Sequence, residues 1–254
     1  MQINIIRILF IFCTIFTGIL GLLIYRMESY LPIFLTRTYR YGKYSVNIYE
    51  PIIAKTEVPR KWFKHFYIFA APASSYVLYL VICIYLWEYD ISKNIMWILD
   101  ICLGSFRQPL GTLICIISES EGFVKGSKGN FSWNKITYFH LLCSIIFILS
   151  TYAQLKSNFI LRKLRKNKDG KINSTIYKIP HDGLFEYVSG ALQITEIIIY
   201  ITLSIILWQS STFHYVTIWV LCNQIWTATL THQWYIQTFK NYPKSRKILI
   251  PFIF

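Results

Sequence analysis

The sequence predicts an all-α membrane protein, a bundle of about five to seven transmembrane helices that forms one integrated domain. Of its 254 residues, 54% are hydrophobic and 18% aromatic, whereas only 15% are charged, which is low for a soluble domain. Apolar runs recur along the chain, and basic residues concentrate in the loops between them. We expect residues 1–135 to supply N-terminal membrane helices and loops, and residues 136–254 to form a C-terminal region that carries most of the recognisable motifs.

Five apolar runs are long enough to cross the ~30 Å hydrocarbon layer as helices. They cover residues 8–25, 66–87, 136–155, 187–208 and 213–230. Only Glu196 interrupts them with a charge. The first run follows Arg7 and shows no small-residue cleavage site, so we interpret it as a retained signal anchor.

The formal net charge of +14 would suggest nucleic acid binding in a soluble protein. Here the basic residues lie in three stretches that flank apolar runs, residues 26–64, 156–171 and the tail from 240. Basic loops of a membrane protein face the cytosol and attract anionic headgroups, which explains the excess without a nucleic acid partner. Two of the stretches could also hold the phosphates of a cofactor.

A sixth apolar stretch, residues 95–117, does not fit a simple crossing. It carries Asp100, Arg107 and Pro109. A crossing here would also place the basic loops on opposite sides of the membrane, against the positive-inside rule. We therefore expect this stretch to be re-entrant or interfacial.

No metal site is expected. Six cysteines fall within apolar runs and show no ligand spacing, so they are interpreted as small buried hydrophobic residues. They lie at positions 13, 83, 102, 115, 143 and 222.

Two polar stripes occur on consecutive predicted helices. Gln193, Glu196 and Tyr200 share one helix face, and a second face on the next helix combines polar residues at four-residue spacing. That second face consists of Asn223, Thr227, Thr231 and Tyr235. An ionisable group at membrane depth indicates a functional site, but spacing alone favours hydrogen bonds between helices.

Several motifs in the sequence resemble those of a known family. The C-terminal set comprises His232-Gln233-Trp234-Tyr235, Phe239, residues 242–247 and residues 250–254; a second set comprises residues 177–180, residues 183–189 and Glu196. Together they resemble the steroid 5-alpha-reductase superfamily, and residues 58–67 and 164–168 are similar to its polyprenol reductase branch. The resemblance is strongest over residues 136–254, which it marks as the catalytic region.

The resemblance implies a multi-pass enzyme of the endoplasmic reticulum membrane. Such an enzyme would use NADPH to saturate the α-isoprene double bond of a polyisoprenoid lipid, on the route to dolichol and protein N-glycosylation. One alternative within the family is a 3-oxo-5-alpha-steroid 4-dehydrogenase. An alternative of another class is a catalytically degraded relative that binds lipid.

The resemblance also nominates site residues. It places Arg165, Arg246 and Lys247 against the cofactor phosphates and Glu196 against the nicotinamide nucleotide, and we add Asn223 and Tyr235 to the cofactor-binding set. The catalytic candidates are His65, His232 and Tyr235, since a donor must face the developing enolate oxygen. Because no Gly-x-Gly-x-x-Gly follows a predicted strand, the cofactor pocket is expected at the cytosolic helix ends.

The sequence also departs from the family pattern. Leu192 and Ala153 stand where relatives have polar side chains, and Asn158 stands where they have Asp or His. A helix with the motif Arg-Arg-x-Tyr/Phe-Glu is missing between residues 88 and 136. These departures motivate the alternative of a truncated or divergent family member.

Overall fold

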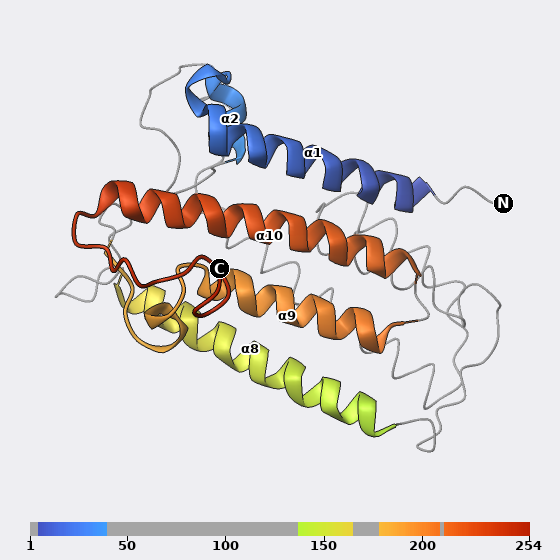
Figure 1. Ribbon diagram of the computed structural model, residues 1–254. Coiled ribbons are helices and arrows are strands. Elements are labelled where there is room, and N and C mark those ends of the chain that lie inside the picture. Colours follow the sequence, from blue (N-terminus) through green and yellow to red (C-terminus); the bar gives the residue numbers. More distant parts are fainter. Residues whose placement is uncertain (1–4, 40–136, 165–177, 209–210) are drawn as a thin grey trace. The chain divides into compact units, whose positions relative to one another are not determined.

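The computed structural model describes residues 5–39, 137–164, 178–208 and 211–254, and these are mostly helical (Figure 1). The long helices are α1 (Ile5–Met27), α8 (Tyr138–Leu164), α9 (Ala191–Ile206) and α10 (Ser211–Thr238). Shorter elements are η1 (Glu28–Tyr30), α2 (Ile33–Tyr39) and η4 (Gly183–Glu186). No β-strand occurs in the part of the chain that is described. The apolar stretches 66–87 and 95–117 lie outside it, so the predicted total number of helices stays a prediction.

Four of the five predicted spans are confirmed as helices, with different ends. The helix expected from residue 187 begins only at Ala191, because the backbone of Ser189 and Gly190 is hydrogen-bonded to the C-terminal segment instead. The helix expected to end at residue 155 continues to Leu164, so residues 156–164 of the predicted basic loop are helical. The helix expected to end at residue 230 continues to Thr238. This extension places the whole His-Gln-Trp-Tyr motif on α10.

Helices α1 and α8 present large apolar side chains to their surroundings. Phe12 on α1 is 65% exposed and Ile148 on α8 is 63% exposed. The residues that α8 buries are instead small, namely Cys143, Ser150 and Ser157, which lie seven residues apart on one face. A helix of a soluble protein shows the reverse distribution, with large apolar side chains buried. The distribution seen here is typical of a helix that faces lipid and contacts other helices through small residues. Both helices are long and apolar enough to cross a membrane.

Helices α1 and α10 approach each other closely through glycine. A Cβ atom at Gly21 would lie 2.5 Å from the Trp226 ring, whereas one at Gly18 would lie 3.4 Å from Cys222 Sγ. Cys222 Sγ also donates a weak hydrogen bond to Thr14 O at 3.7 Å. Small residues on α1 therefore admit the large side chains of α10.

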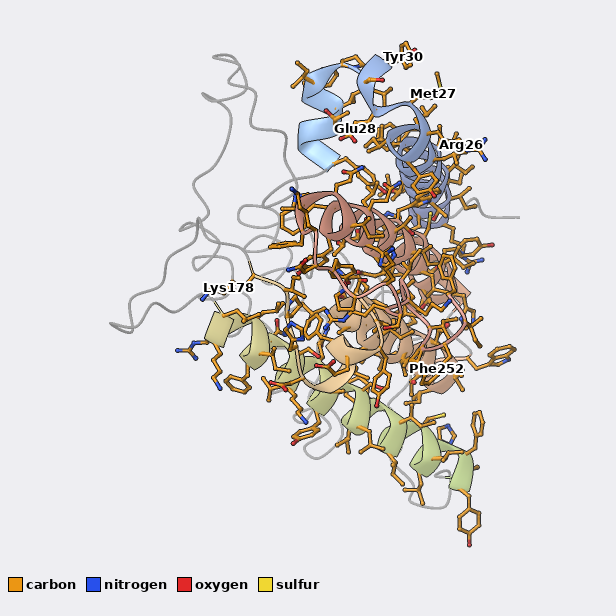
Figure 2. The ribbon with its side chains drawn as sticks, turned by 60° about the vertical axis from the view of Figure 1, so that its left-hand side comes forward. Arg26, Met27, Glu28, Tyr30, Lys178 and Phe252 are labelled. Atoms are coloured by element: carbon orange, nitrogen blue, oxygen red, sulfur yellow. The ribbon has the colours of Figure 1, made fainter. Side chains whose placement is uncertain are left out.

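The short helix α2 folds back on α1 where the chain turns at η1; Figure 2 labels Arg26, Met27, Glu28 and Tyr30 at this turn. Tyr39 donates its hydroxyl hydrogen to Thr17 O at 3.3 Å. Burial raises the pKa of the Tyr39 phenol, so the hydroxyl keeps the proton that this bond requires.

A histidine fastens the start of α10 to the end of α9. His214 Nδ1 lies 2.6 Å from Ser204 Oγ, and His214 Nε2 lies 3.0 Å from Trp208 O. Because a carbonyl only accepts, Nε2 carries a hydrogen and donates it to Trp208 O. The two helices are thus joined at this end by one imidazole.

Candidate active site

The C-terminal segment pairs with the chain just before α9, which brings distant motifs together. Ser189 N donates to Lys247 O, Lys247 N donates to Tyr187 O, and Gly190 N donates to Ile248 O, each at 2.9 Å. Val188 and Lys247 form a parallel bridge. Figure 1 shows the C-terminal end returning beside the start of α9. The two sets of family-like motifs therefore form one local structure.

Gly190 permits this pairing to lie against α10. A Cβ atom at Gly190 would be 2.8 Å from Ala228 Cβ and 3.0 Å from Ile248 O. No side chain fits in that space without moving backbone, so the close approach depends on glycine. At the end of the segment, Phe252 packs its ring on Tyr187, with centroids 5.7 Å apart (Phe252 is labelled in Figure 2).

Three polar side chains from three segments meet beside this pairing. Ser189 Oγ lies 2.6 Å from His232 Nδ1 on α10 and 2.6 Å from the Tyr242 hydroxyl oxygen in the C-terminal segment. Ser189 Oγ also lies 3.3 Å from Lys247 O. Ser189 and Tyr242 are buried, whereas His232 is half-buried. We call Ser189, His232 and Tyr242 the polar triad.

Aromatic rings fix the orientation of the triad. Tyr235 stacks on Tyr242 with centroids 5.3 Å apart and an interplanar angle of 7°, and His232 meets Tyr242 edge-on at 6.0 Å. Tyr235 is only 2% exposed. His232 and Tyr235 lie three residues apart on α10 and so present the same helix face to Tyr242.

Arg246 lies over the Tyr242 ring and is almost fully enclosed, with 1% of its side chain exposed. Its Nη1 donates to Pro180 O at 2.8 Å and its Nη2 donates to His181 Nδ1 at 3.2 Å. The guanidinium carbon lies 5.5 Å from the centroid of the Tyr242 ring. Arg246 Nε is buried without a hydrogen-bonding partner among the described residues.

Glu186 completes the surroundings of Arg246. Its Oε2 lies 3.9 Å from Arg246 Nη2, and its Oε1 accepts a hydrogen bond from Asp182 N at 2.7 Å. That second bond closes a tight turn in which Asp182 and Gly183 have φ values of 77° and 59°. A non-glycine residue in this region carries strain, which the Glu186 bond and the Arg246 contacts help to offset.

The sequence-predicted residues fall into three groups in the structure. His232, Tyr235 and Arg246 come together around Tyr242, and Lys247 joins them through its backbone while its side chain is half-exposed. Glu196 on α9 and Asn223 on α10 are half-buried, and no described contact links either to the polar triad. His65 and Arg165 lie outside the described residues.

Ser189 and Tyr242 both lie within the family-like motifs, but the sequence alone assigned a role to neither. No periodicity could have joined them, because 43 residues separate Ser189 from His232 and 53 separate it from Tyr242. The one sequence feature that could have identified Ser189 and Tyr242 is that both lie in the family-like motifs. Within the described ranges, no group of three or more His, Cys, Asp or Glu residues could hold a metal ion.

Three known proteins illustrate what this chain is similar to. The chain is 29% identical to polyprenal reductase of Drosophila melanogaster, over 99% of this chain and 94% of the relative. It is 38% identical to polyprenal reductase of Homo sapiens, over 46% of this chain and 37% of the relative. It is 43% identical to 3-oxo-5-alpha-steroid 4-dehydrogenase 2 of Rattus norvegicus, over 43% of this chain and 41% of the relative.

The alignment with the fly protein also shows a difference in length. It extends over 309 positions, 55 more than the 254 residues of this chain, so the relative has residues where this chain has none. The absence of a family helix between residues 88 and 136 stays a prediction from the sequence. Residues 111–254, more than half of the chain, match the family described as 3-oxo-5-alpha-steroid 4-dehydrogenase. The chain belongs to that family, the 5-alpha-reductases.

Proposed function

We propose that this protein is a polyprenal reductase, an NADPH-dependent oxidoreductase that saturates the α-isoprene double bond of a polyisoprenoid in the endoplasmic reticulum membrane. The similarity to the fly polyprenal reductase carries this proposal, because it extends over 99% of the chain. The lipid-facing apolar surfaces of α1 and α8 support a membrane location. The product would serve dolichol synthesis and protein N-glycosylation.

The residues present fit a dinucleotide in part. Lys247, Asn223 and Glu196 are each partly exposed, and we assign them to the nucleotide. Arg246 does not fit as a direct phosphate ligand, because its guanidinium is enclosed by Pro180 and His181. We assign the phosphates to Lys247 and Arg165, and assign to Arg246 the positioning of the turn around Asp182.

The chemistry requires a hydride and a proton. NADPH, when bound, supplies a hydride to the β-carbon of a double bond conjugated to a carbonyl. The protein must stabilise the developing enolate oxygen and deliver a proton to complete the α-carbon. His232 is suited to hold that proton, because its Nε2 has no hydrogen-bonding partner among the described residues. Tyr235 orients Tyr242 by stacking on its ring. His65 stays a second candidate proton donor.

A steroid substrate is the second candidate function. It is favoured by the 43% identity to the rat steroid dehydrogenase, which is higher than the identity to the fly or human polyprenal reductase. That match covers less than half of either protein, however, whereas the match to the fly polyprenal reductase covers nearly all of both. The full-length similarity therefore outweighs it.

Microsomes can separate these candidates. Cells without their own polyprenal reductase would express this chain, and their microsomes would receive NADPH with either a polyprenal or a 3-oxo-Δ4-steroid. Saturation of the polyprenal with little steroid turnover supports the proposal. The reverse preference assigns the chain to the steroid branch, and no turnover from a well-expressed chain identifies a degraded relative.

A further inference from the structure

We propose that Tyr242 and Ser189 form a proton relay to His232, in which the Tyr242 hydroxyl donates to Ser189 Oγ and the Ser189 hydroxyl donates to His232 Nδ1. The assignment of a reductive proton transfer to His232 rests on the proposed function. The relay itself rests on the two 2.6 Å contacts of Ser189 Oγ. Ser189 and Tyr242 thereby act as positioning residues that set which imidazole nitrogen carries the hydrogen.

The number of hydrogens available at Ser189 Oγ determines the direction of these hydrogen bonds. Ser189 Oγ has one hydrogen and three close neighbours, and Lys247 O among them can only accept. Lys247 O already accepts from Ser189 N at 2.9 Å, and its distance of 3.3 Å from Ser189 Oγ is the longest of the three. The serine hydrogen is therefore better placed on one of the two short contacts.

The remaining choice is between Tyr242 and His232 as acceptor. If Ser189 donated to Tyr242, the phenolic hydrogen would need another acceptor, and no described residue offers one. If Ser189 donates to His232 Nδ1, the phenolic hydrogen goes to Ser189 Oγ and both short contacts are satisfied. His232 then carries its hydrogen on Nε2, the nitrogen that has no partner among the described residues.

In the relay each proton moves only across one hydrogen bond of 2.6 Å between heavy atoms. As His232 Nε2 gives its proton to the enolate formed by hydride addition, Nδ1 takes the Ser189 proton and Ser189 Oγ takes the Tyr242 proton. The imidazole stays neutral, and the negative charge moves to the Tyr242 oxygen. A proton from solvent then binds His232 Nε2, Nδ1 returns its proton to Ser189 Oγ, and Ser189 Oγ returns one to the Tyr242 oxygen, which restores both the phenol and the starting tautomer.

The surroundings suit that transient charge. Arg246 places a permanent positive charge 5.5 Å from the Tyr242 ring centroid, in a site where 1% of its side chain is exposed. Coulomb attraction is stronger in such a poorly hydrated site than in water. Other titratable residues near the triad are Tyr235, which stacks on Tyr242, and Lys247, whose carbonyl oxygen lies 3.3 Å from Ser189 Oγ. Glu186 and His181 both contact Arg246.

Kinetics of two conservative variants test the relay. Ser189→Ala removes the central hydroxyl, and Tyr242→Phe removes the phenol oxygen but keeps the ring that stacks on Tyr235. Each is expected to lower kcat for polyprenal roughly 10- to 100-fold and to change KM for NADPH less than about twofold. Because the hydroxyls act in series, the double variant should be no slower than Ser189→Ala. Unchanged kcat, or multiplicative losses in the double variant, would overturn the relay.

Thr202→Val is the matched control. Thr202 is also buried, and its hydroxyl donates only to Ile198 O within α9, at 2.7 Å. The substitution removes a buried hydroxyl that makes no hydrogen bond to the triad, so kcat should stay at the wild-type value. A loss equal to that of Ser189→Ala would show that any buried hydroxyl matters and would contradict the specific role.

A second measurement decides the relay without turnover. Nitrogen-15 NMR of the histidine-labelled full chain in lipid nanodiscs reports the ring tautomer, and the His232→Gln spectrum identifies the His232 signals. The relay predicts an Nε2–H tautomer in the wild type, and an Nδ1–H tautomer would refute it. A chain that shows the predicted tautomer but does not reduce polyprenal would defeat the proposed function and leave the hydrogen-bond assignment supported.

Discussion

Tyr242 is the residue at which the candidate site is organised. It is stacked on Tyr235, meets His232 edge-on and lies under Arg246, so three sequence-predicted residues share one neighbour that the sequence did not single out. Residue types and motifs predicted which side chains matter. They could not predict that Arg246 is enclosed, because enclosure depends on the turn formed by residues 180–186.

At this scale, replacing Arg246 tests its assignment as a positioning residue. Arg246→Ala should lower the free energy of unfolding by roughly 1.5–3 kcal/mol, because charge-assisted hydrogen bonds to Pro180 O and His181 are lost. Arg246→Lys should recover only part of the loss, since an ammonium group lacks the planar fork that reaches both partners. Thermal unfolding in detergent measures both. A wild-type melting temperature in Arg246→Ala, with weakened NADPH binding, would instead favour direct phosphate contact.

At the scale of elements, the apolar runs predicted four of the described helices, but they did not predict where α9 begins or where α8 and α10 end. The start of α9 is delayed because Ser189 and Gly190 use their backbone hydrogens on the C-terminal segment. This is a long-range contact that local hydrophobicity does not encode. The extension of α10 into a polar sequence likewise depends on packing by Tyr235 and His232.

The contact of α1 with α10 gives a matched pair of glycine substitutions. Gly21→Ala places a methyl group 2.5 Å from the Trp226 ring, whereas Gly18→Ala places one at an ordinary 3.4 Å from Cys222 Sγ. We expect Gly21→Ala to destabilise the protein by roughly 1–3 kcal/mol through overpacking and Gly18→Ala to be tolerated. Melting temperatures of the two variants check this difference. Equal melting temperatures would contradict the tight α1–α10 contact.

At the scale of the whole molecule, the positive-inside rule predicts an orientation. Two sequons, Asn130-Phe131-Ser132 and Asn173-Ser174-Thr175, lie outside the described residues. The charge distribution places Asn130 in the lumen and Asn173 in the cytosol, so only Asn130 should carry a glycan. Glycosidase-sensitive mobility of Asn130→Gln and Asn173→Gln variants tests this. Loss of a glycan in the Asn173→Gln variant would show that Asn173 faces the lumen and would contradict the predicted orientation.

The central claim concerns a whole-molecule activity, hydride transfer from NADPH to a polyisoprenoid. The most direct measurement supplies the purified chain in lipid nanodiscs with NADPH that carries deuterium at the transferable C4 position, together with a polyprenal. Mass spectrometry of the product then locates the label. The proposed polyprenal reductase activity predicts a saturated α-isoprene unit with one deuterium at its β-carbon. A product without deuterium, or an unreacted polyprenal beside a deuterated 3-oxo-5α-steroid in a parallel reaction, would contradict it.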